Sequence, residues 1–539
     1  MGYPINLRRP PSLIVAASNA PADLVSRADY VCDGTADDVQ LQAAHDALLA
    51  TGGEILLTPG QFNLSAPVLV SKPGVTIRGV GYGTILKLAN AANCSAIATT
   101  VAGAEGFCLR DMKIDGNGAN QTAPTYTTSV TGTDADPTVL TKAGAWTGLN
   151  LTGAYCYVGG RKVRTTSGGG YYCQIASNTD DTLTLDRNIS SGGALSGLEV
   201  VVYKDGSYAG PLVRLHSSNV THPYGEKALL TGLWLTGGAD CGILLEACRR
   251  SKIHNVFVQL MTGHGIRSSN FHMEISACGI YSCSKYGHYA DQIEDCSFVG
   301  TNFAYNTLGG LYSASGSFVS ECHFYRNGYG IVSASTTSIV GCKFQGNTED
   351  CINTPSATRI AACSFINNYK ACVNNAADSQ IVGNRFWSTV ATANTYSEVV
   401  CNYRCQVVGN EFGVSSGNSM KRGVWFQVSN QGHRVESNYF NATYGTETIS
   451  APGASDVIRN NTGYVTENAG TATVASGQTS VTVNHGCALT PAHILVTPTN
   501  SLGNATKFYV SSITSTQFTV AVDQDPGATT ATFAWSVRI

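Results

Sequence analysis

The side chains of this chain that could do chemistry are carboxylates gathered in its central part. Hydrolysis of a glycosidic bond needs two carboxyls, about 5–5.5 Å apart for retention of configuration or about 6.5–9.5 Å apart for inversion. Like charges at such distances raise the pKa of one carboxyl, which suits that group to act as an acid. The candidate catalytic residues, including one histidine, are Asp240, Glu246, His264, Glu274, Asp291, Glu294, Asp295 and Glu321.

Cations and aromatic rings are interspersed among these carboxylates. A sugar-binding groove offers aromatic faces to the sugar rings and polar groups to their hydroxyls. Removal of a proton beside a uronate carboxylate instead needs a base and a cation that neutralises the carboxylate. An ordinary solvated sheet face is the alternative interpretation. The candidate substrate-binding residues are Arg267, Lys285, His288, Tyr289 and Tyr312.

A repeat between residues 253 and 440 defines the elements that must position these side chains. Its pattern is an aliphatic residue, two variable residues, Cys or Asn, one variable residue and Phe. The copies are IEDCSF (293–298), VSECHF (319–324), IVGCKF (339–344), IAACSF (360–365), IVGNRF (381–386), VVGNEF (407–412) and VESNYF (435–440). Copies 20–28 residues apart are too short for strand–helix–strand crossovers, so they predict the stacked coils of a parallel β-helix.

Stacking brings equivalent positions of successive coils to about 4.8 Å from each other. A shorter second repeat, aligned on its glycine, predicts one outward column of Leu244, Arg267, Tyr289, Tyr312 and Val332. The next outward column contains Glu246, Ser269 and Asp291. Glu246 and Asp291 would lie two coils, or about 9.6 Å, apart, near the distance for an inverting pair.

Two further carboxylate pairs follow from the same stacking. Glu274 would share a column with Glu294, next to His254, and Asp295 would pair with Glu321. Each pair could equally be a solvated surface feature.

The 18 cysteines are explained by the same repeat. The predicted column is Cys296, Cys322, Cys342 and Cys363, continued by Asn384, Asn410 and Asn438. A buried thiol packs as a small apolar group, so we expect reduced structural thiols, with disulfides or a metal as the alternative. Pairs such as Cys401 and Cys405 lack a histidine at zinc-finger spacing, so no metal and no cofactor are expected.

Composition excludes several classes of protein. With 43% hydrophobic and 13% charged residues, the chain can bury a core and is not disordered. A net charge of −3 argues against nucleic acid as a partner. No apolar run approaches the roughly 18 residues of a membrane span, so membrane insertion is not expected. The apolar stretch 13–17 is too short for a signal peptide, which favours synthesis in the cytoplasm.

The segment CDGTADDVQLQAAHDALLATGGEILLTPG, which begins at residue 32, resembles the opening of pectate-lyase-like right-handed β-helix proteins, of the phage tailspike and polysaccharide depolymerase type. The resemblance implies an all-β fold in which a helix, starting near Asp33, Asp37 and Asp38, caps the first coil. We expect an N-terminal cap with the first coils (1–126), an inserted small β domain (127–206), the main right-handed parallel β-helix (207–465) and a C-terminal β-sandwich-like module (466–539).

Two further resemblances concern function. GADCGI (238–243) and GHGI (263–266) are similar to the Asp-Asp-Cys and Gly-His-Gly motifs of polygalacturonases, although Ala239 replaces the first aspartate. This similarity implies that Asp240 is an acid or base and that His264 is its neighbour. The C-terminal segment is similar to modules of phage tail fibres and tailspikes, which implies a homotrimer in a virion tail, made in the host cytoplasm, or an extracellular protein.

Together these features predict a polysaccharide depolymerase that hydrolyses a surface or acidic polysaccharide with two carboxylates. A polysaccharide lyase or epimerase acting on uronates is the first alternative. A tail spike that binds glycans without catalysis is the second.

Overall fold

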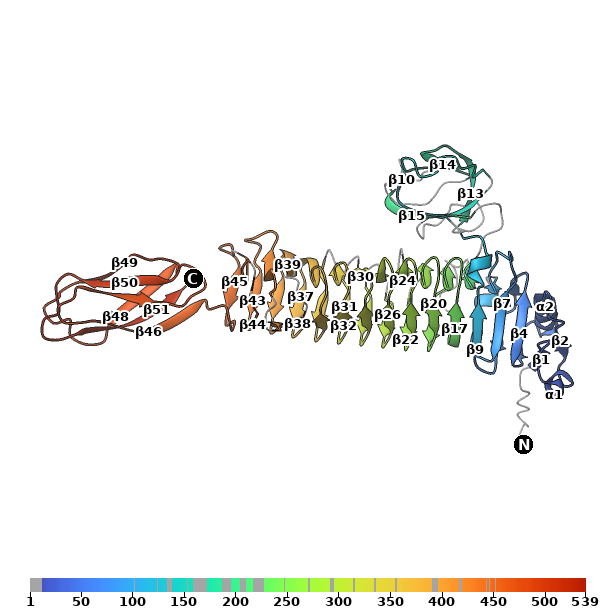
Figure 1. Cartoon of the computed structure of the whole chain (residues 1–539), viewed down its shortest axis with the longest axis horizontal. Helices are drawn as coiled ribbons and strands as arrows, with labels where there is room; N and C mark the ends of the chain where they lie inside the picture. The colour runs from blue at the N-terminus through green and yellow to red at the C-terminus, as the bar shows by residue number, and fades with distance from the viewer. Residues whose placement is uncertain are drawn as a thin grey trace, which may run out of the picture. The chain divides into compact units, whose positions relative to one another are not determined.

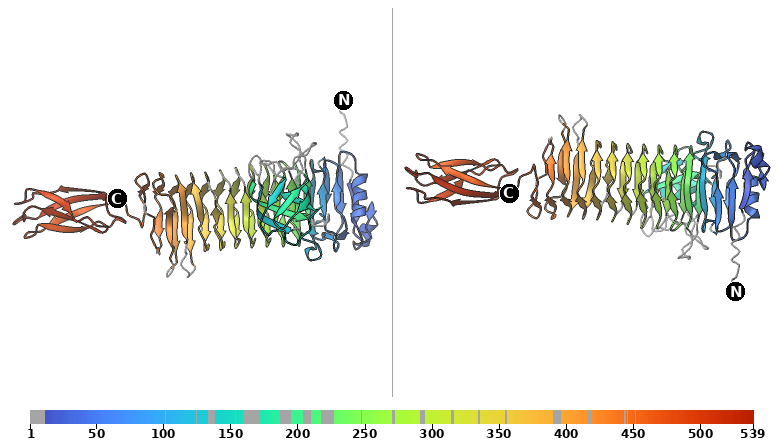
Figure 2. Two further views of the ribbon diagram at one scale, coloured as in Figure 1. Left: turned by 90° about the horizontal axis from the view of Figure 1, so that it is seen from above. Right: turned by 90° about the horizontal axis from the view of Figure 1, so that it is seen from below.

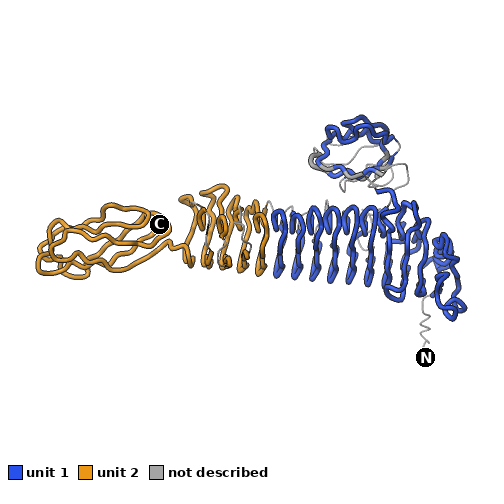
Figure 3. Tube along the Cα trace, in the orientation of Figure 1, with its two compact units in different colours: residues 1–355 blue, residues 356–539 orange. Residues whose placement is uncertain are grey.

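The computed structural model describes residues 12–539, with gaps at 101, 124, 133–137, 153, 159–171, 187–194, 204–209, 217–226, 247, 270–271, 291–294, 314–315, 334–335, 354–355, 390–395, 416–418, 443, 445 and 451. The chain forms two compact units, residues 1–355 and 356–539 (Figure 3). Within the described residues, no helix is both long and apolar enough to cross a membrane.

The first unit contains a β-helix whose coils each have three short strands. One coil comprises β22 (Glu274–Ser276), β23 (Gly279–Tyr281) and β24 (Tyr286–Ala290). The next two coils comprise β25 (Ser297–Val299), β26 (Asn302–Ala304), β27 (Gly309–Ser313), β28 (Phe318–Ser320), β29 (His323–Tyr325) and β30 (Tyr329–Ser333). Each strand pairs in parallel with its equivalent one coil on, so these strands lie side by side in every view (Figures 1 and 2). The stacked coils predicted from the repeat are therefore confirmed.

A left-handed residue turns the chain between the first and second strands of each coil. Ala277, Gly300 and Glu321 occupy this corner with φ of 52°, 57° and 53°. The residue that follows points inward, as Cys278 and Cys322 do, and both thiols are buried. The Cys278 sulfur lies 3.5 Å from the carbonyl oxygen of Ile253 in the coil before, so the thiol bridges two coils.

The structure corrects one copy of the repeat. Phe298 pairs with Val319 on the first strand of the coil, whereas Phe303 stacks on Phe324 with ring centroids 5.1 Å apart. The described residues of this copy, 295–298, therefore lie one strand earlier than the alignment predicts. Cys296 accordingly precedes the first strand of its coil and does not belong to the column of Cys322.

The second unit contains coils built on an asparagine column. The backbone N–H groups of Asn384, Asn410 and Asn438 each donate to the side-chain oxygen of the next asparagine, ending at Asn461, at 2.9 Å. The side-chain amide of Asn410 donates to the carbonyl of Ile381 at 2.8 Å. These buried amides satisfy the backbone groups that each corner turns inward. Stacked rings beside them, Phe365, Phe386, Phe412 and Phe440, have centroids 4.7–4.8 Å apart.

Residues 467–538 of the second unit form two antiparallel sheets. One contains β46 (Glu467–Val474), β51 (Ala531–Arg538) and β48 (His493–Pro498). The other contains β47 (Ser480–Asn484), β50 (Gln517–Val522) and β49 (Phe508–Ser511). Alternate residues of both sheets, including Val474, Phe518 and Phe533, share one core, the arrangement of a small β-sandwich.

A closed β-barrel interrupts the β-helix of the first unit. Its strands, in order around the barrel, are β10 (Thr125–Gly132), β11 (Val139–Thr141), β14 (Thr182–Leu185), β13 (Tyr172–Asn178), β12 (Tyr155–Val158) and β15 (Leu195–Tyr203). Trp146, Leu140 and Val200 are fully buried in its interior. The barrel has its own core and is joined to the coils at both of its ends.

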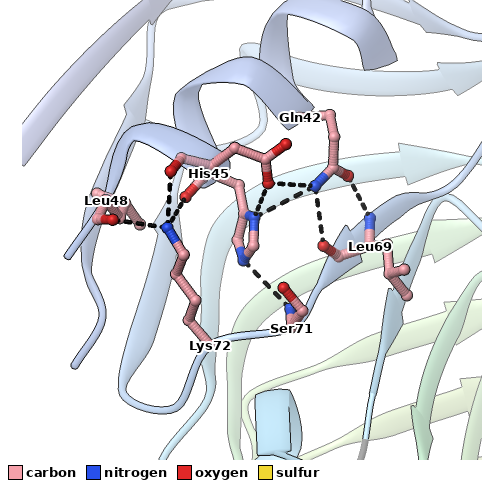
Figure 4. Close-up of polar contacts among 7 residues, drawn as sticks. Gln42, His45, Leu48, Leu69, Ser71 and Lys72 are labelled. Atoms are coloured by element: carbon pink, nitrogen blue, oxygen red, sulfur yellow. Dashed lines mark hydrogen bonds and ion pairs between the residues drawn. The ribbon is translucent and has the colours of Figure 1, made fainter. Parts of the chain in front are cut away.

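Helix α2 (Asp38–Ala47) covers the N-terminal coil. Gln42 donates to the carbonyl of Leu69 and accepts from its N–H, at 3.2 and 2.8 Å, and Lys72 donates to the last carbonyls of the helix, those of His45, Asp46 and Leu48 (Figure 4). The helix thereby satisfies the backbone groups of β5 (Val68–Val70), which would otherwise form an open sheet edge.

The aspartates at the start of α2 bind backbone rather than capping the helix. Asp37 accepts from the N–H of Asn63 and Asp38 accepts from the N–H of Ser65, both at 2.7 Å. They fasten the helix to the strand beside it.

We predict that Asn410→Ala lowers the free energy of unfolding by about 2–4 kcal/mol, because it removes buried hydrogen bonds and leaves their backbone partners unsatisfied. Urea unfolding followed by circular dichroism measures the change. The matched control is Gln406→Ala, an exposed position just before Asn410. Equal stability of the two variants would contradict a structural role for the asparagine column.

Candidate functional site

The outward face of five neighbouring strands in the first unit brings predicted substrate-binding residues together. These strands are β18 (Ile243–Glu246), β21 (Ile266–Ser269), β24, β27 and β30. Their register forms a single ladder of Leu244, Arg267, Tyr289, Tyr312 and Val332. The alignment of the sequence predicted this ladder. The alternate positions of these strands point into the core, as the full burial of Ile243, Ile266, Leu311 and Ile331 shows.

Aromatic rings line this face. Tyr289 stacks on Tyr312 with centroids 4.9 Å apart, and on the ring of His264 at 4.5 Å. Tyr286, which sequence reasoning missed, lies 5.3 Å from Tyr312 and 5.9 Å from Tyr289. The guanidinium of Arg267 lies over Tyr289 at 5.9 Å. The face therefore combines aromatic surface with a cation, as a carbohydrate site requires.

A carboxylate from the inserted barrel completes the cluster. Oε1 of Glu199, on β15, lies 3.0 Å from Nε2 of His264 and 3.3 Å from Nη2 of Arg267. Glu199 and Arg267 are 4% and 1% exposed. The sequence carried no signal for this contact, because Glu199 belongs to no repeat and lies 65 residues before His264.

The ionisable groups of this cluster shift one another's pKa values. Burial alone would raise the pKa of Glu199, but His264, Arg267 and Lys285 outweigh it and hold the pKa at about 2. Burial lowers the pKa of His264, against the opposing effect of Glu199. Near neutral pH the cluster therefore holds an ionised Glu199, a charged Arg267 and a neutral imidazole. This arrangement has Nε2 of His264 donating to Glu199 while its Nδ1 accepts from the N–H of Tyr286 at 3.3 Å.

Glu246 is a second buried carboxylate on the same face. It is fully buried and accepts from Nε of Arg214 at 2.9 Å. Leu244, two residues before Glu246, is in register with Arg267 on the next strand. Strand and residue spacings therefore put the Cα atoms of Glu246 and Arg267 about 8 Å apart. Glu199, which pairs with Arg267, and Glu246, which pairs with Arg214, are therefore two buried carboxylates along the same face.

Asp240 lies in the turn that leads into β18 and is 1% exposed. Its carbonyl accepts the N–H of Gly263, which ties this turn to the one containing His264. Burial, and after it the charge of Asp240, raises the pKa of the adjacent Cys241 thiol. The similarity of 238–243 and 263–266 to polygalacturonase motifs therefore falls on two segments that are in contact.

Two of the predicted carboxylate pairs, Glu246 with Asp291 and Glu274 with Glu294, each include a residue that the structure does not describe. Asp291 and Glu294 lie outside the described residues. Glu274 is in register with Lys252 and Ser297 and forms an exposed ion pair with Lys252 at 2.8 Å.

Asp295 and Glu321 occupy different corners of their coils. Asp295 lies two residues before β25, next to His272 at 3.6 Å, whereas Glu321 directly follows β28. The misaligned repeat copy at 293–298 is the cause of this wrong pairing.

His288 is also corrected. It occupies the inward column, between Ile266 and Leu311, and its ring packs on Phe298 with centroids 5.1 Å apart. Its Nε2 lies 2.9 Å from the hydroxyl of Ser268. Because the ring is fully buried in the core, it cannot touch a bound glycan. Lys285 remains at the site, half-buried, and its charge acts on Glu199.

Comparison with known families agrees with this architecture. Residues 241–386 match the family described as the right-handed beta helix region. The fold is a right-handed parallel β-helix. Among curated proteins, none is significantly similar to this chain in sequence.

Solved structures similar to this β-helix include two phage proteins. The tailspike gp61 of Pseudomonas phage phi297 is 13% identical with a TM-score of 0.49, covering 93% of this chain and 91% of its own. The tailspike gp49 of Pseudomonas phage LKA1 is 12% identical with a TM-score of 0.45, covering 92% of each chain. The A-module of the mannuronan C-5 epimerase AlgE6 from Azotobacter vinelandii is 15% identical with a TM-score of 0.42, and the match covers 80% of this chain and 97% of the A-module.

Burial lowers the pKa of His288 from 6.5 to about 3, with a smaller contribution from His264. Between these values the unfolded chain binds a proton that the folded chain excludes, so stability falls as the pH is lowered. We predict that His288→Leu flattens this dependence by about 2–3 kcal/mol between roughly pH 6 and pH 4. Urea unfolding at a series of pH values measures it.

The exposed His254→Gln variant is the control for this measurement and should retain the wild-type pH dependence. A dependence in His288→Leu as steep as in the wild type would show that His288 is not buried in its neutral form.

Proposed function

We propose that this chain is a polysaccharide depolymerase that hydrolyses glycosidic bonds on the outward face of strands β18, β21, β24, β27 and β30. The observation that carries the proposal is that two buried carboxylates, Glu199 against Arg267 and Glu246 on β18, lie at the face that presents the ladder of Tyr289 and Tyr312. Tyrosine rings suit the stacking of sugar rings, and the carboxylates suit acid–base work on the bond between them.

The roles of the carboxyls follow from their surroundings. Glu199, with its pKa near 2, is ionised at working pH and can act as the base or nucleophile but not as the acid. We assign the acid to Asp240, in the turn before β18, or to Glu246, on β18, both of which are buried carboxyls. Arg267 and His264 hold Glu199 in place and do not exchange the proton themselves.

Substrate binding requires movement of the barrel. Arg267 and Tyr289 are 1% and 8% exposed, and Glu199 on β15 lies directly against Arg267. A glycan can stack on the tyrosines only when β15 moves away from them. Opening of this contact to admit the glycan, and its closure to return Glu199 to the bond, are therefore both part of the proposed catalytic cycle.

We place the protein in a virion tail, or outside the cell, as a homotrimer. Large apolar side chains on the coil surface, with Phe257 39% and Phe318 45% exposed, suit burial between subunits.

Glu246→Gln and Asp240→Asn are predicted to lower the rate of glycosidic bond cleavage, by about 100-fold or more for the one that supplies the acid. The assay follows new reducing ends from a panel of bacterial surface and plant acidic polysaccharides. Glu411→Gln, at an exposed ion pair with Arg385 in the second unit, is the control and should cleave at the wild-type rate. Full activity in both test variants would exclude this carboxylate mechanism.

A polysaccharide lyase acting on uronates is the second candidate. Its support is that Arg267, His264 and Lys285 all act on a single carboxylate, that of Glu199. A uronate carboxylate that replaced Glu199 would meet the same neutralising groups, with Tyr289 beside it as a base.

Tyr289→Phe separates the two candidates, because it keeps the ring and removes the hydroxyl. For a hydrolase we expect reducing ends to form within a few-fold of the wild-type rate, without ultraviolet absorbance from unsaturated uronates. For a lyase we expect that absorbance in the wild type and its loss by about 100-fold in the variant. Binding of a polysaccharide without cleavage would instead support a non-catalytic spike.

A further inference from the structure

Two cysteines of the inserted barrel face each other across neighbouring strands. Strands β12 and β13 pair in antiparallel orientation, with Cys156 directly opposite Cys173. Their sulfur atoms lie 3.2 Å apart, and the two residues are 0% and 1% exposed. Both thiols belong to the core of the barrel, so they point to the same side of the sheet.

The backbone of this pair suits a disulfide bond. Residues directly opposite each other on antiparallel strands have Cα atoms about 4.5–5.5 Å apart. Disulfides join cysteines whose Cα atoms are about 4.4–6.8 Å apart. The neighbouring positions, Tyr155 opposite Gln174 and Tyr157 opposite Tyr172, keep the same register. The strands therefore already hold the separation that the bond requires, and rotation of the two side chains brings the sulfurs together.

The cysteines of the coils are placed differently. The sulfur of Cys278 faces the carbonyl oxygens of Ile253 and Ser276, at 3.5 and 3.2 Å. The sulfur of Cys322 is likewise directed at two carbonyl oxygens, at 3.5 and 3.3 Å. In the barrel the short contact is between two sulfurs, and the carbonyl oxygen of Cys156 lies 3.7 Å from the sulfur of the partner cysteine.

Packing alone does not require two thiols at this place. The other core residues that the structure describes in the barrel are aliphatic, apart from Trp146. A facing pair of small aliphatic side chains would fill the same space without placing two S–H groups in an apolar core. A disulfide removes both S–H groups and keeps the sulfurs as apolar packing surface.

We propose that Cys156 and Cys173 form a disulfide bond once the protein is outside the reducing cytoplasm. The oxidant is another disulfide, such as oxidised glutathione. One cysteine thiolate attacks it and releases one thiol, and the second cysteine thiolate then attacks the mixed disulfide and releases the other thiol. The two cysteines lose two protons and two electrons, and the oxidant gains them as two S–H groups.

Burial controls when the bond forms and how long it lasts. Because both sulfurs are buried, the oxidant reaches them only when β12 and β13 separate locally. The cytoplasm keeps thiols reduced, so oxidation follows release from the cell, and in this respect alone the inference rests on the proposed function. Once the strands close again, the same burial shields the bond from reductants.

The bond would fasten the strands next to the one that carries Glu199. Strand β12 pairs with β13 on one side and with β15, the strand of Glu199, on the other. The cross-link joins residues 17 apart in sequence, so it restricts the unfolded barrel more than the folded one. A small domain gains much from such a bond, because its core is small.

The test uses the full chain, first reduced and then incubated with oxidised glutathione just below the unfolding temperature, where strands open locally. The chain is then denatured with an alkylating agent, digested and analysed by mass spectrometry. We expect a peptide pair that joins Cys156 to Cys173 in most chains, and its absence from chains kept in reductant. We also expect hydrogen exchange of the backbone N–H groups of β12 and β13 to slow by about tenfold or more on oxidation.

Cys156→Ala and Cys173→Ala should each abolish the linked peptides and the slower exchange. Cys278→Ala, which removes a buried thiol of a coil, is the matched control and should keep both. The proposal is overturned if exhaustive oxidation of the wild-type chain yields no such peptide pair, or if either barrel cysteine is instead joined to glutathione or to a different cysteine.

The decisive peptide is sought in the wild-type chain, so this outcome does not depend on the folding of a variant. The oxidant is supplied in vitro and no polysaccharide is cleaved in the assay. Failure of the cross-link is therefore distinct from failure of the proposed function.

Discussion

The stacking of small polar or thiol side chains at one corner of each coil is the constraint on which this structure depends. A single left-handed residue turns the chain there, and the next side chain enters the interior, as Cys278 and Asn410 do. A coil of three short strands cannot bury its inward face alone, so it is stable only against its neighbours. The asparagines satisfy the backbone groups turned inward, and the stacked phenylalanines supply the apolar burial.

Because the side chains of the inward columns stabilise the fold, the residues of the outward columns can vary and can serve binding or catalysis. In the first unit one such column presents Arg267, Tyr289 and Tyr312 in consecutive coils, at the spacing of neighbouring strands. The inserted barrel adds what the column lacks, a carboxylate set against the guanidinium. The pKa of Glu199 stays near 2 because His264, which donates a hydrogen bond, and the charges of Arg267 and Lys285 together outweigh the effect of burial. The same contact closes the face, so binding and barrel movement are coupled in the proposed mechanism.

The cysteines show how neighbouring side chains decide the chemistry of one residue type. In the cysteine column, burial raises the pKa of Cys278 and the thiol acts as a small apolar group. At the corner shared with His433, the hydrogen bond between Cys401 and Cys405 lowers the pKa of Cys405 and raises that of Cys401. The two environments are equally dry, so the difference comes from the hydrogen-bonding partners and not from solvent.

The sequence by itself determined the stacked coils and the ladder of Leu244, Arg267 and Tyr289, because a short period repeats the same local geometry in every coil. It misplaced the copy at 293–298. The reason is that a buried Cys or Ser can stand before the first strand of a coil as well as after it, with an aromatic residue close by in both cases. That error produced the wrong pairing of Asp295 with Glu321. The interior position of His288 was missed for another reason, because outward and inward positions alternate within one short strand. Only the tertiary structure placed Glu199 on Arg267. Glu199 reaches its partners through packing of a separate barrel, and this contact has no period, so no local pattern in the chain could encode it.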